Sequence, residues 1–171
     1  MKIVAFSGKK RSGKDTAAKF LAAELDHVTV GYASFALPLK HDISRFLSIG
    51  LDQLEDNKAK YRRLLQFWGQ FAKELYGEGY WIQKLNTQLN VGTTDVTLVT
   101  DVRHANEAEY IRSRGGVIVR INRTGYASDD DHVTETEMDS YGRFDYVYHA
   151  RTIMELNSCM KDLAYKLQEK Q

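Results

Sequence analysis

A glycine-bounded run of basic and polar residues near the start of the chain has the composition of a phosphate-binding loop. The segment Gly8-Lys-Lys-Arg-Ser-Gly-Lys-Asp-Thr16 follows the spacing G-x-x-x-x-G-K. The two glycines allow backbone angles that turn successive N–H groups toward an anion, and the lysine adds a mobile cation for the outer phosphates. The run therefore predicts a nucleotide polyphosphate site, whose contact residues are Gly8, Lys10, Ser12, Gly13, Lys14, Asp15 and Thr16.

Asp15 occupies the position at which this pattern normally has a hydroxyl. A carboxylate is a harder and more strongly charged magnesium ligand than a hydroxyl. We therefore expect Asp15 to hold Mg2+, directly or through water, and Thr16 to bind an inner phosphate oxygen.

A second pair of candidate residues follows the apolar run that starts at Val96. Asp101 comes where a core strand is expected to end, a place from which an aspartate can hold magnesium through its waters. Arg103 can neutralise phosphate with a planar fork of donors that a lysine lacks. The alternative makes Asp101 the N-cap of the next helix and Arg103 a surface ion pair.

Aromatic, amide and basic side chains gather in the helical patterns that follow the second expected strand. Such side chains can stack on a base and read its edge while a cation holds a phosphate. For the aromatic residues the alternative is a place in the core. We interpret the set as acceptor-binding: Phe35, Lys40, Arg63, Gln66, Trp68 and Gln70.

Residues 122–142 are polar, charged and rich in turn formers. They follow the fourth expected strand, where a mobile cover over the phosphates would be attached, so we interpret them as a lid-like loop in which Arg123 reaches the nucleotide. His132 with the run Asp129–Asp131 matches no metal-ligand spacing, and an acidic solvated loop is the preferred interpretation.

Short β-rich apolar runs alternate with helical patterns, which predicts an α/β domain with a five-stranded parallel sheet covered by helices. The expected strands are Lys2–Ser7, Val28–Ala33, Val96–Thr100, Val117–Ile121 and Tyr146–Tyr148. The expected helices are Lys14–Leu25, Pro38–Leu47, Lys58–Tyr76, Tyr80–Leu89, Ala105–Arg114 and Ile153–Lys170. We predict one domain over residues 1–171, in which the helical region 36–90 is placed to build a second substrate pocket.

The bulk properties exclude some classes of partner. The net charge is +1, from 24 basic and 23 acidic residues, so no overall field recruits a nucleic-acid polymer or a membrane. The single cysteine, Cys159, has no partner for an internal disulfide, which fits a reducing cytoplasm. The chain shows no leader and no apolar run of membrane-spanning length, and we expect a cytoplasmic protein.

Several segments in order along the chain together resemble phage-type deoxynucleoside monophosphate kinases. They are the loop Gly8–Thr16, then Phe35-Ala-Leu-Pro-Leu-Lys40, Gln66-Phe-Trp-Gly69, Thr100-Asp-Val-Arg-His-Ala-Asn-Glu107, Gly115-Gly116 and His132-Val-Thr-Glu135. The resemblance implies a three-layer P-loop fold and transfer of the γ-phosphoryl group of ATP, with Mg2+, to a deoxynucleoside monophosphate. It also implies Glu107 as a substrate-binding residue and, for a phage-encoded protein, the host cytoplasm.

Animal-type phosphomevalonate kinases are similar as well: they share the Arg-Ser-Gly-Lys-Asp loop and the Asp-x-Arg after the third strand. We prefer the nucleotide acceptor, because the Asn106-Glu107 pair and the residues around Trp68 suit it better. In this scheme Lys14 and the loop amides hold ATP, Asp15 and Asp101 organise magnesium, and Arg11 and Arg103 contact the donor and acceptor phosphates.

Two other interpretations remain open at this stage. A P-loop ATPase switch would hydrolyse ATP without a small acceptor, and the long helical excursion argues against it. A kinase acting on nucleic-acid ends would need a basic track, which the balanced charge does not supply. The sequence leaves a homodimer open.

Overall fold

The computed structural model describes residues 1–125 and 137–169. The chain forms two compact units, which we call the sheet unit and the helical unit. The sheet unit comprises Met1–Tyr32 with Thr93–Gln171, and the helical unit comprises Ala33–Gly92. The expected helical region 36–90 falls within the second of these units.

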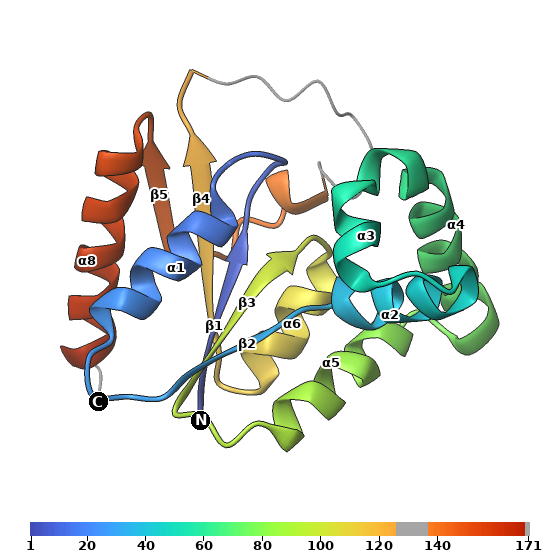
Figure 1. Cartoon of the computed structure of the whole chain (residues 1–171). Coiled ribbons are helices and arrows are strands. Elements are labelled where there is room, and N and C mark those ends of the chain that lie inside the picture. The colour runs from blue at the N-terminus through green and yellow to red at the C-terminus, as the bar shows by residue number, and fades with distance from the viewer. Residues whose placement is uncertain (126–136, 170–171) are drawn as a thin grey trace. The chain divides into compact units, whose positions relative to one another are not determined.

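A five-stranded sheet forms the centre of the sheet unit, with the strand order β2-β3-β1-β4-β5 (Figure 1). The strands are β1 (Lys2–Ser7), β2 (Val30–Ala33), β3 (Val96–Val102), β4 (Val117–Arg123) and β5 (Tyr146–Ala150). β1 pairs in parallel with both β3 and β4, and β4 pairs in parallel with β5. The predicted five-stranded parallel sheet is confirmed.

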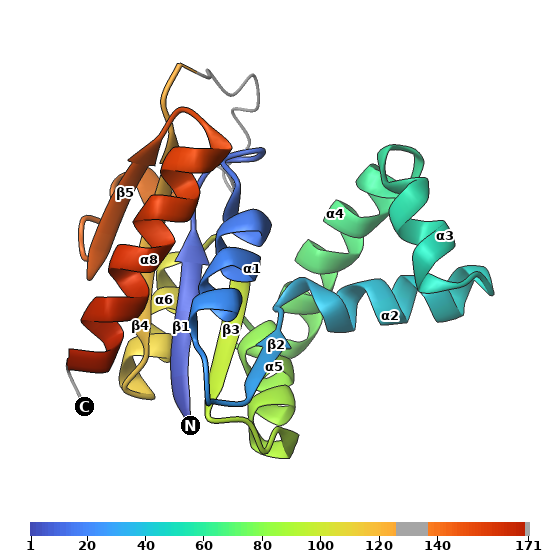
Figure 2. The ribbon, with the colours of Figure 1, turned by 60° about the vertical axis from the view of Figure 1, so that its left-hand side comes forward.

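Helices cover both faces of this sheet, because side chains alternate along each strand. Val4 and Phe6 of β1 belong to the main core cluster with α1 (Lys14–Glu24) and α8 (Ile153–Glu169). On the opposite face lies α6 (Ala105–Ser113), as Figure 2 shows. On that face Gly116 lies so close to Ile111 that a β-carbon would come within 2.5 Å of it.

The helical unit contains α2 (Ala36–Leu47), α3 (Leu51–Asp56), α4 (Lys58–Tyr76) and α5 (Tyr80–Val91). Its small core is built from Ile43, Leu54 and Leu65, with Trp68 partly buried against them. Leu54 belongs to α3, which the sequence analysis did not predict. Glycine ends α4 at Gly77, which has a φ of 95°, a conformation that favours glycine.

Most expected elements are present with ends shifted by a few residues. β2 begins at Val30 rather than at residue 28, and α2 begins at Ala36, two residues before Pro38. The strands β3, β4 and β5 each continue further than expected. A short 3-10 helix, η1 (Glu137–Asp139), was not predicted.

The expected lid-like loop 122–142 is described only at its two ends. The interval 126–136, which includes His132, Asp129–Asp131 and Glu135, lies outside the described residues. Among the described residues no helix is both long enough and apolar enough to cross a membrane.

Candidate active site

The loop between β1 and α1 lies at the edge of the sheet toward which the arrowheads of β1, β4 and β5 point (Figure 1). Gly8, its first residue, has a φ of 156°, and a β-carbon there would lie 2.4 Å from the Ile121 carbonyl oxygen and 2.6 Å from Ser12 Oγ. Gly13 is left-handed, with a φ of 97°, and as the N-cap of α1 it has no side chain to cap the first turn. The backbone amides and positive dipole end of α1 are thus available to an anion.

The side chain of Lys14 folds back onto this loop. Its ammonium group donates to the Gly8 carbonyl oxygen at 2.6 Å and to the Lys9 carbonyl oxygen at 2.9 Å. The Lys9 carbonyl also accepts the Ser12 N–H at 3.1 Å. The cation is therefore already held over the loop, where phosphate oxygens of a nucleotide would meet it.

Two arginines lie at the loop. Arg11 is exposed and has a φ of 61°, a left-handed conformation that is uncommon outside glycine and is often retained at functional sites. Arg123, at the end of β4, reaches the Arg11 carbonyl oxygen with one guanidinium nitrogen at 3.5 Å. The structure thus brings together two residues that the sequence analysis singled out separately.

A cavity of about 360 Å³ adjoins the loop. Its lining joins the loop and Arg123 to the start of α8, and consists of Arg11, Ser12, Gly13, Lys14, Asp15, Thr16, Arg123, Ala150, Arg151, Thr152, Ile153 and Leu156. The Ser12 hydroxyl oxygen is buried and has no hydrogen-bond partner among the described residues. An open cradle of amides, a cation and an orphaned hydroxyl has the donor chemistry that a polyphosphate requires.

The end of β3 lies beside the start of the loop. Val102 pairs with Ser7, the last residue of β1, so Asp101 and Arg103 flank the position at which the phosphate loop begins. The N-cap of α6 is His104. The interpretation of Asp101 as a helix cap is therefore wrong, and the interpretation as a magnesium ligand stays a prediction.

Glu107 has a clear local role. Its side chain is only 6% exposed, and its Oε2 accepts the backbone N–H groups of Arg103 at 2.8 Å and His104 at 3.1 Å. This is the reciprocal bond of a capping box, which fixes how the chain enters α6. Glu107 thus holds the backbone of Arg103 in place, a role that the S/T-x-x-E spacing rule would miss because the cap is a histidine.

The six acceptor residues predicted in the helical region lie in the helical unit, whereas Arg103 and Glu107 belong to the sheet unit. Phe35 is only 4% exposed, so it is a core residue, as the alternative interpretation expected. Trp68 donates its indole N–H to Asp42 at 3.3 Å. Lys40 is paired with Glu55 at 2.5 Å. The exposed members of the set are Arg63, Gln66 and Gln70, of which Gln70 donates to Glu74 at 3.1 Å.

The charges around Glu55 show how the helical unit holds its cations. Partial burial raises the pKa of Glu55, but the hydrogen bond and charge of Lys40, together with Lys58, outweigh it and lower the pKa below its ordinary value.

In the sheet unit, burial raises the pKa of the Cys159 thiol on α8. A thiol with a raised pKa is a poor nucleophile, which supports a packing role for it.

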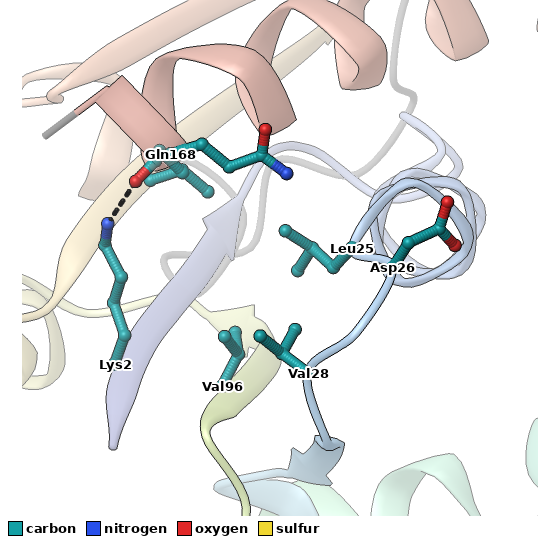
Figure 3. Close-up of a pocket in the computed structure, with 7 residues that line it drawn as sticks. Lys2, Leu25, Asp26, Val28, Val96 and Gln168 are labelled. Carbon is teal, nitrogen blue, oxygen red and sulfur yellow. Dashed lines mark hydrogen bonds between the residues drawn. The ribbon is translucent and has the colours of Figure 1, made fainter. Parts of the chain in front are cut away.

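A second cavity, of about 180 Å³, lies at the opposite edge of the sheet unit (Figure 3). Leu25, Val28 and Val96 face it, and the Lys2 ammonium group beside it donates to the Leu167 carbonyl oxygen at 2.7 Å. Because Lys2 and Val96 begin β1 and β3, this cavity lies at the amino ends of parallel strands. Ligands of such sheets bind at the carboxyl ends, where the phosphate loop is found.

No group of three or more His, Cys, Asp or Glu side chains gathers for a metal within the part of the chain that the structure describes. Magnesium does not require such a cage, since it usually binds one or two carboxylates, waters and substrate phosphates. Asp15, exposed in the first turn of α1, and Asp101, at the end of β3, have suitable oxygens and fit that pattern.

A parallel sheet of this order with a phosphate loop after β1 is the fold of P-loop kinases. The model of the phosphomevalonate kinase family matches residues 6–116, more than half of the chain, and the protein belongs to that family. The crystal structure of shikimate kinase from Aquifex aeolicus superposes with a TM-score of 0.53 at 14% identity, covering 96% of both chains. That likeness confirms the P-loop kinase fold.

The curated relatives include both kinds of kinase that the sequence resembles. A protein of Acanthamoeba polyphaga mimivirus, provisionally named deoxynucleotide monophosphate kinase, is 27% identical over 92% of this chain and 93% of its own length. Deoxynucleotide monophosphate kinase of Escherichia phage RB69 is 35% identical over 43% of this chain and 32% of its own. Phosphomevalonate kinase of Drosophila melanogaster is 31% identical over 68% of this chain and 62% of its own length. The predicted resemblance to deoxynucleotide monophosphate kinases is confirmed.

Proposed function

We propose that this kinase transfers the γ-phosphoryl group of ATP to a deoxynucleoside monophosphate. The observation that carries the choice of acceptor is the similarity to the mimivirus protein, which extends over 92% of this chain and 93% of that one. The similarity to the Drosophila phosphomevalonate kinase covers less of both chains. ATP and a small phosphorylated acceptor are thus the proposed partners, and the products are ADP and a deoxynucleoside diphosphate.

The phosphate loop holds the donor in this proposal. The amides at the start of α1 and the Ser12 hydroxyl bind phosphate oxygens, and Lys14 moves from the loop carbonyls to the outer phosphates. Thr16 binds an inner phosphate oxygen. Arg11 and Arg103 neutralise the charge that accumulates as donor and acceptor phosphates approach, and each such preorganised cation is worth about 3 kcal/mol of transition-state stabilisation.

Asp15 and Asp101 hold magnesium, directly or through water. Bound Mg2+ supplies charge neutralisation at the phosphate oxygens of the donor. Asp15 lies in the helix turn that follows Lys14, and Asp101 lies one residue before the pairing of Val102 with Ser7. Each carboxylate thus adjoins one end of the phosphate loop.

The reaction itself needs positioning more than it needs a base. A phosphate oxygen of the acceptor already carries a lone pair and negative charge, and it forms the new bond to Pγ in line with the departing ADP. The bond from Pγ to the bridging oxygen breaks, and its electron pair leaves with ADP. Catalysis by positioning and electrostatics is the general pattern for such transfers.

The far end of the 360 Å³ cavity is proposed to receive the nucleoside part of ATP. There Ala150, Arg151, Thr152 and Ile153 line the cavity together with Arg123. Ile153 is an exposed apolar side chain, 70% accessible, suited to lie against the face of a base. These residues were not predicted from the sequence.

The acceptor is assigned to the helical unit, where Arg63 and Gln66 are exposed three residues apart on α4. Gln70 and Lys40 are the further polar candidates there, and Trp68 the aromatic one. Phe35 enters the proposal as a buried support, since it is 4% exposed. Glu107 enters it as the residue that holds the Arg103 backbone.

Phosphomevalonate is the second candidate acceptor, and the family-model match over residues 6–116 favours it. A coupled assay of ADP release separates the two. The purified protein is given ATP and magnesium with each deoxynucleoside monophosphate, with phosphomevalonate, with an oligonucleotide and with no acceptor. The proposal expects release that depends on a deoxynucleoside monophosphate. Release with phosphomevalonate alone would transfer the assignment to the second candidate, and equal release without any acceptor would indicate an ATPase.

A further inference from the structure

A buried arginine lies beneath the phosphate loop. Arg120 interrupts the apolar run of β4 and is 6% exposed. It pairs in register with Ser7, and its guanidinium donates to Ser7 Oγ at 3.2 Å and to Asn122 Oδ1 at 3.3 Å. A buried charge is costly unless it is paired, and here the counter-charge is Asp139, which accepts a hydrogen bond from the remaining guanidinium nitrogen.

Asp139 also holds the loop itself. Its second carboxylate oxygen lies 3.1 Å from the Lys9 ammonium group. The carbonyl oxygen of Lys9 accepts the Ser12 N–H and the Lys14 ammonium group. The contacts therefore close a ring from Ser7 through the buried arginine and Asp139 to Lys9, which spans both sides of Gly8.

The same short helix reaches the other half of the site. Glu137 Oε1 accepts the backbone N–H of Ala105 at 2.8 Å, and its Oε2 lies 2.6 Å from His104 Nδ1. These residues directly follow Arg103. The helix η1 (Glu137–Asp139) thus contacts both the phosphate loop and the start of α6 next to Arg103, and all three lie in the sheet unit.

We propose that Asp139 is a positioning residue of the phosphate loop, which acts through Lys9 and the buried Arg120. By holding the Lys9 side chain, Asp139 fixes the Lys9 carbonyl oxygen, which accepts the hydrogen bond that orients Lys14. The same ion pair neutralises the Lys9 ammonium group, so that this group does not bind phosphate. A loop that is ordered before the nucleotide arrives does not lose that ordering entropy on binding. The proposal uses the assignment of this loop to ATP, and it extends that assignment to a residue more than a hundred positions away in the chain.

The test substitutes side chains that are themselves partly exposed. Lys9→Met removes the ammonium group, and Asp139→Asn keeps an oxygen acceptor for the buried arginine. Lys9→Arg is the conservative variant that restores the pair. Lys166→Met is the matched control, because Lys166 also pairs with an aspartate, at 2.5 Å, and its side-chain exposure of 42% is close to the 44% of Lys9.

The first readout is hydrogen–deuterium exchange of the loop amides in the nucleotide-free protein. The proposal expects Lys9→Met and Asp139→Asn each to accelerate exchange of the loop about fivefold, the effect of losing one partly exposed ion pair. The double variant should match Asp139→Asn, because that change already removes the pair with Lys9, and Lys9→Arg and Lys166→Met should match the parent. Unchanged exchange in both single variants, or additive effects in the double variant, would overturn the proposal.

The second readout is the KM for ATP in the acceptor assay. Both single variants should raise it in the same direction, with Lys9→Arg restoring it, whereas a merely structural role would lower thermal stability without a change in KM. If Lys9 instead bound phosphate directly, Asp139→Asn would free the ammonium group and lower the KM, which contradicts the proposal. A parent protein that lacks ATP turnover would refute the proposed function, and the exchange experiment would still decide the role of Asp139.

Discussion

Replacing Gly8 by alanine tests the geometry of the loop most sharply. The added β-carbon would lie 2.4 Å from the Ile121 carbonyl oxygen, a backbone atom in the central part of the sheet, and 2.6 Å from Ser12 Oγ. Ordinary contacts begin near 3.4 Å, so the two sides must separate by the difference of about 1 Å. Because Ile121 pairs with β5 and belongs to the core, the loop must move. A misplacement of about 1 Å lowers kcat/KM about a hundredfold, and the strain lowers the free energy of unfolding by about 1–3 kcal/mol.

The assay for Gly8→Ala is ADP release with the best acceptor, together with chemical denaturation. Gly115→Ala is the matched control, because Gly115 has a φ of 72° and no atom of the described residues lies within 4 Å of its added β-carbon. That control carries the backbone strain without the collision, so it should lose about 1 kcal/mol of stability and keep its activity. A Gly8→Ala protein with parental kcat/KM would refute the reasoning, since the loop would then tolerate a displaced start.

Three further predictions concern single side chains. Lys14→Met should lower kcat about a hundredfold, while Lys19→Met, exposed on the same helix, should leave kcat unchanged in the same assay. Arg103→Ala should lower turnover by a similar factor with little change in circular dichroism; loss of the folded spectrum would contradict the assigned role. The pKa of Glu55 is lower in the folded protein than in the unfolded chain, so the ionised side chain stabilises the fold at pH values above its unfolded pKa. This contribution is lost as the pH falls through the folded pKa of Glu55. In chemical denaturation, Glu55→Gln should therefore have a lower free energy of unfolding than the parent at neutral pH, and this difference should disappear in acid. The difference should be below about 1 kcal/mol, because the partner Lys40 is partly exposed. A difference that does not depend on pH would contradict the prediction.

The sheet and the phosphate loop were predictable because their signals are local. Short apolar runs such as Lys2–Ser7 and Val96–Thr100 form buried strands, and a glycine-bounded loop between a strand and a helix commonly binds phosphate. Helix α4 was predicted with its correct ends, Lys58 and Tyr76, since it is long and strongly amphipathic. Helix α3 was missed because Leu51–Asp56 is too short to show a helical period.

Contacts between distant segments were not predictable from the sequence. The pairing of Asp139 with Lys9 depends on the order of strands, which places the end of β4 beside the end of β1. One signal was present: a charged residue, Arg120, within an apolar strand implies a buried partner. No sequence signal indicated that Arg151 and Ile153 line the cavity beside the phosphate loop. The sequence pattern at the start of a helix is the same whether or not a cavity adjoins it.

The central claim is that ATP binds with its phosphates in the loop between β1 and α1. Titration of magnesium and ATP into the protein in a calorimeter tests it directly, with Lys14→Met and the Lys19→Met control titrated in parallel. The account predicts saturable heat for the parent and for Lys19→Met, and a binding constant weakened at least tenfold for Lys14→Met, in which the cation over the loop is lost. No heat of binding to the parent, or equal affinity in the Lys14→Met protein, would contradict it.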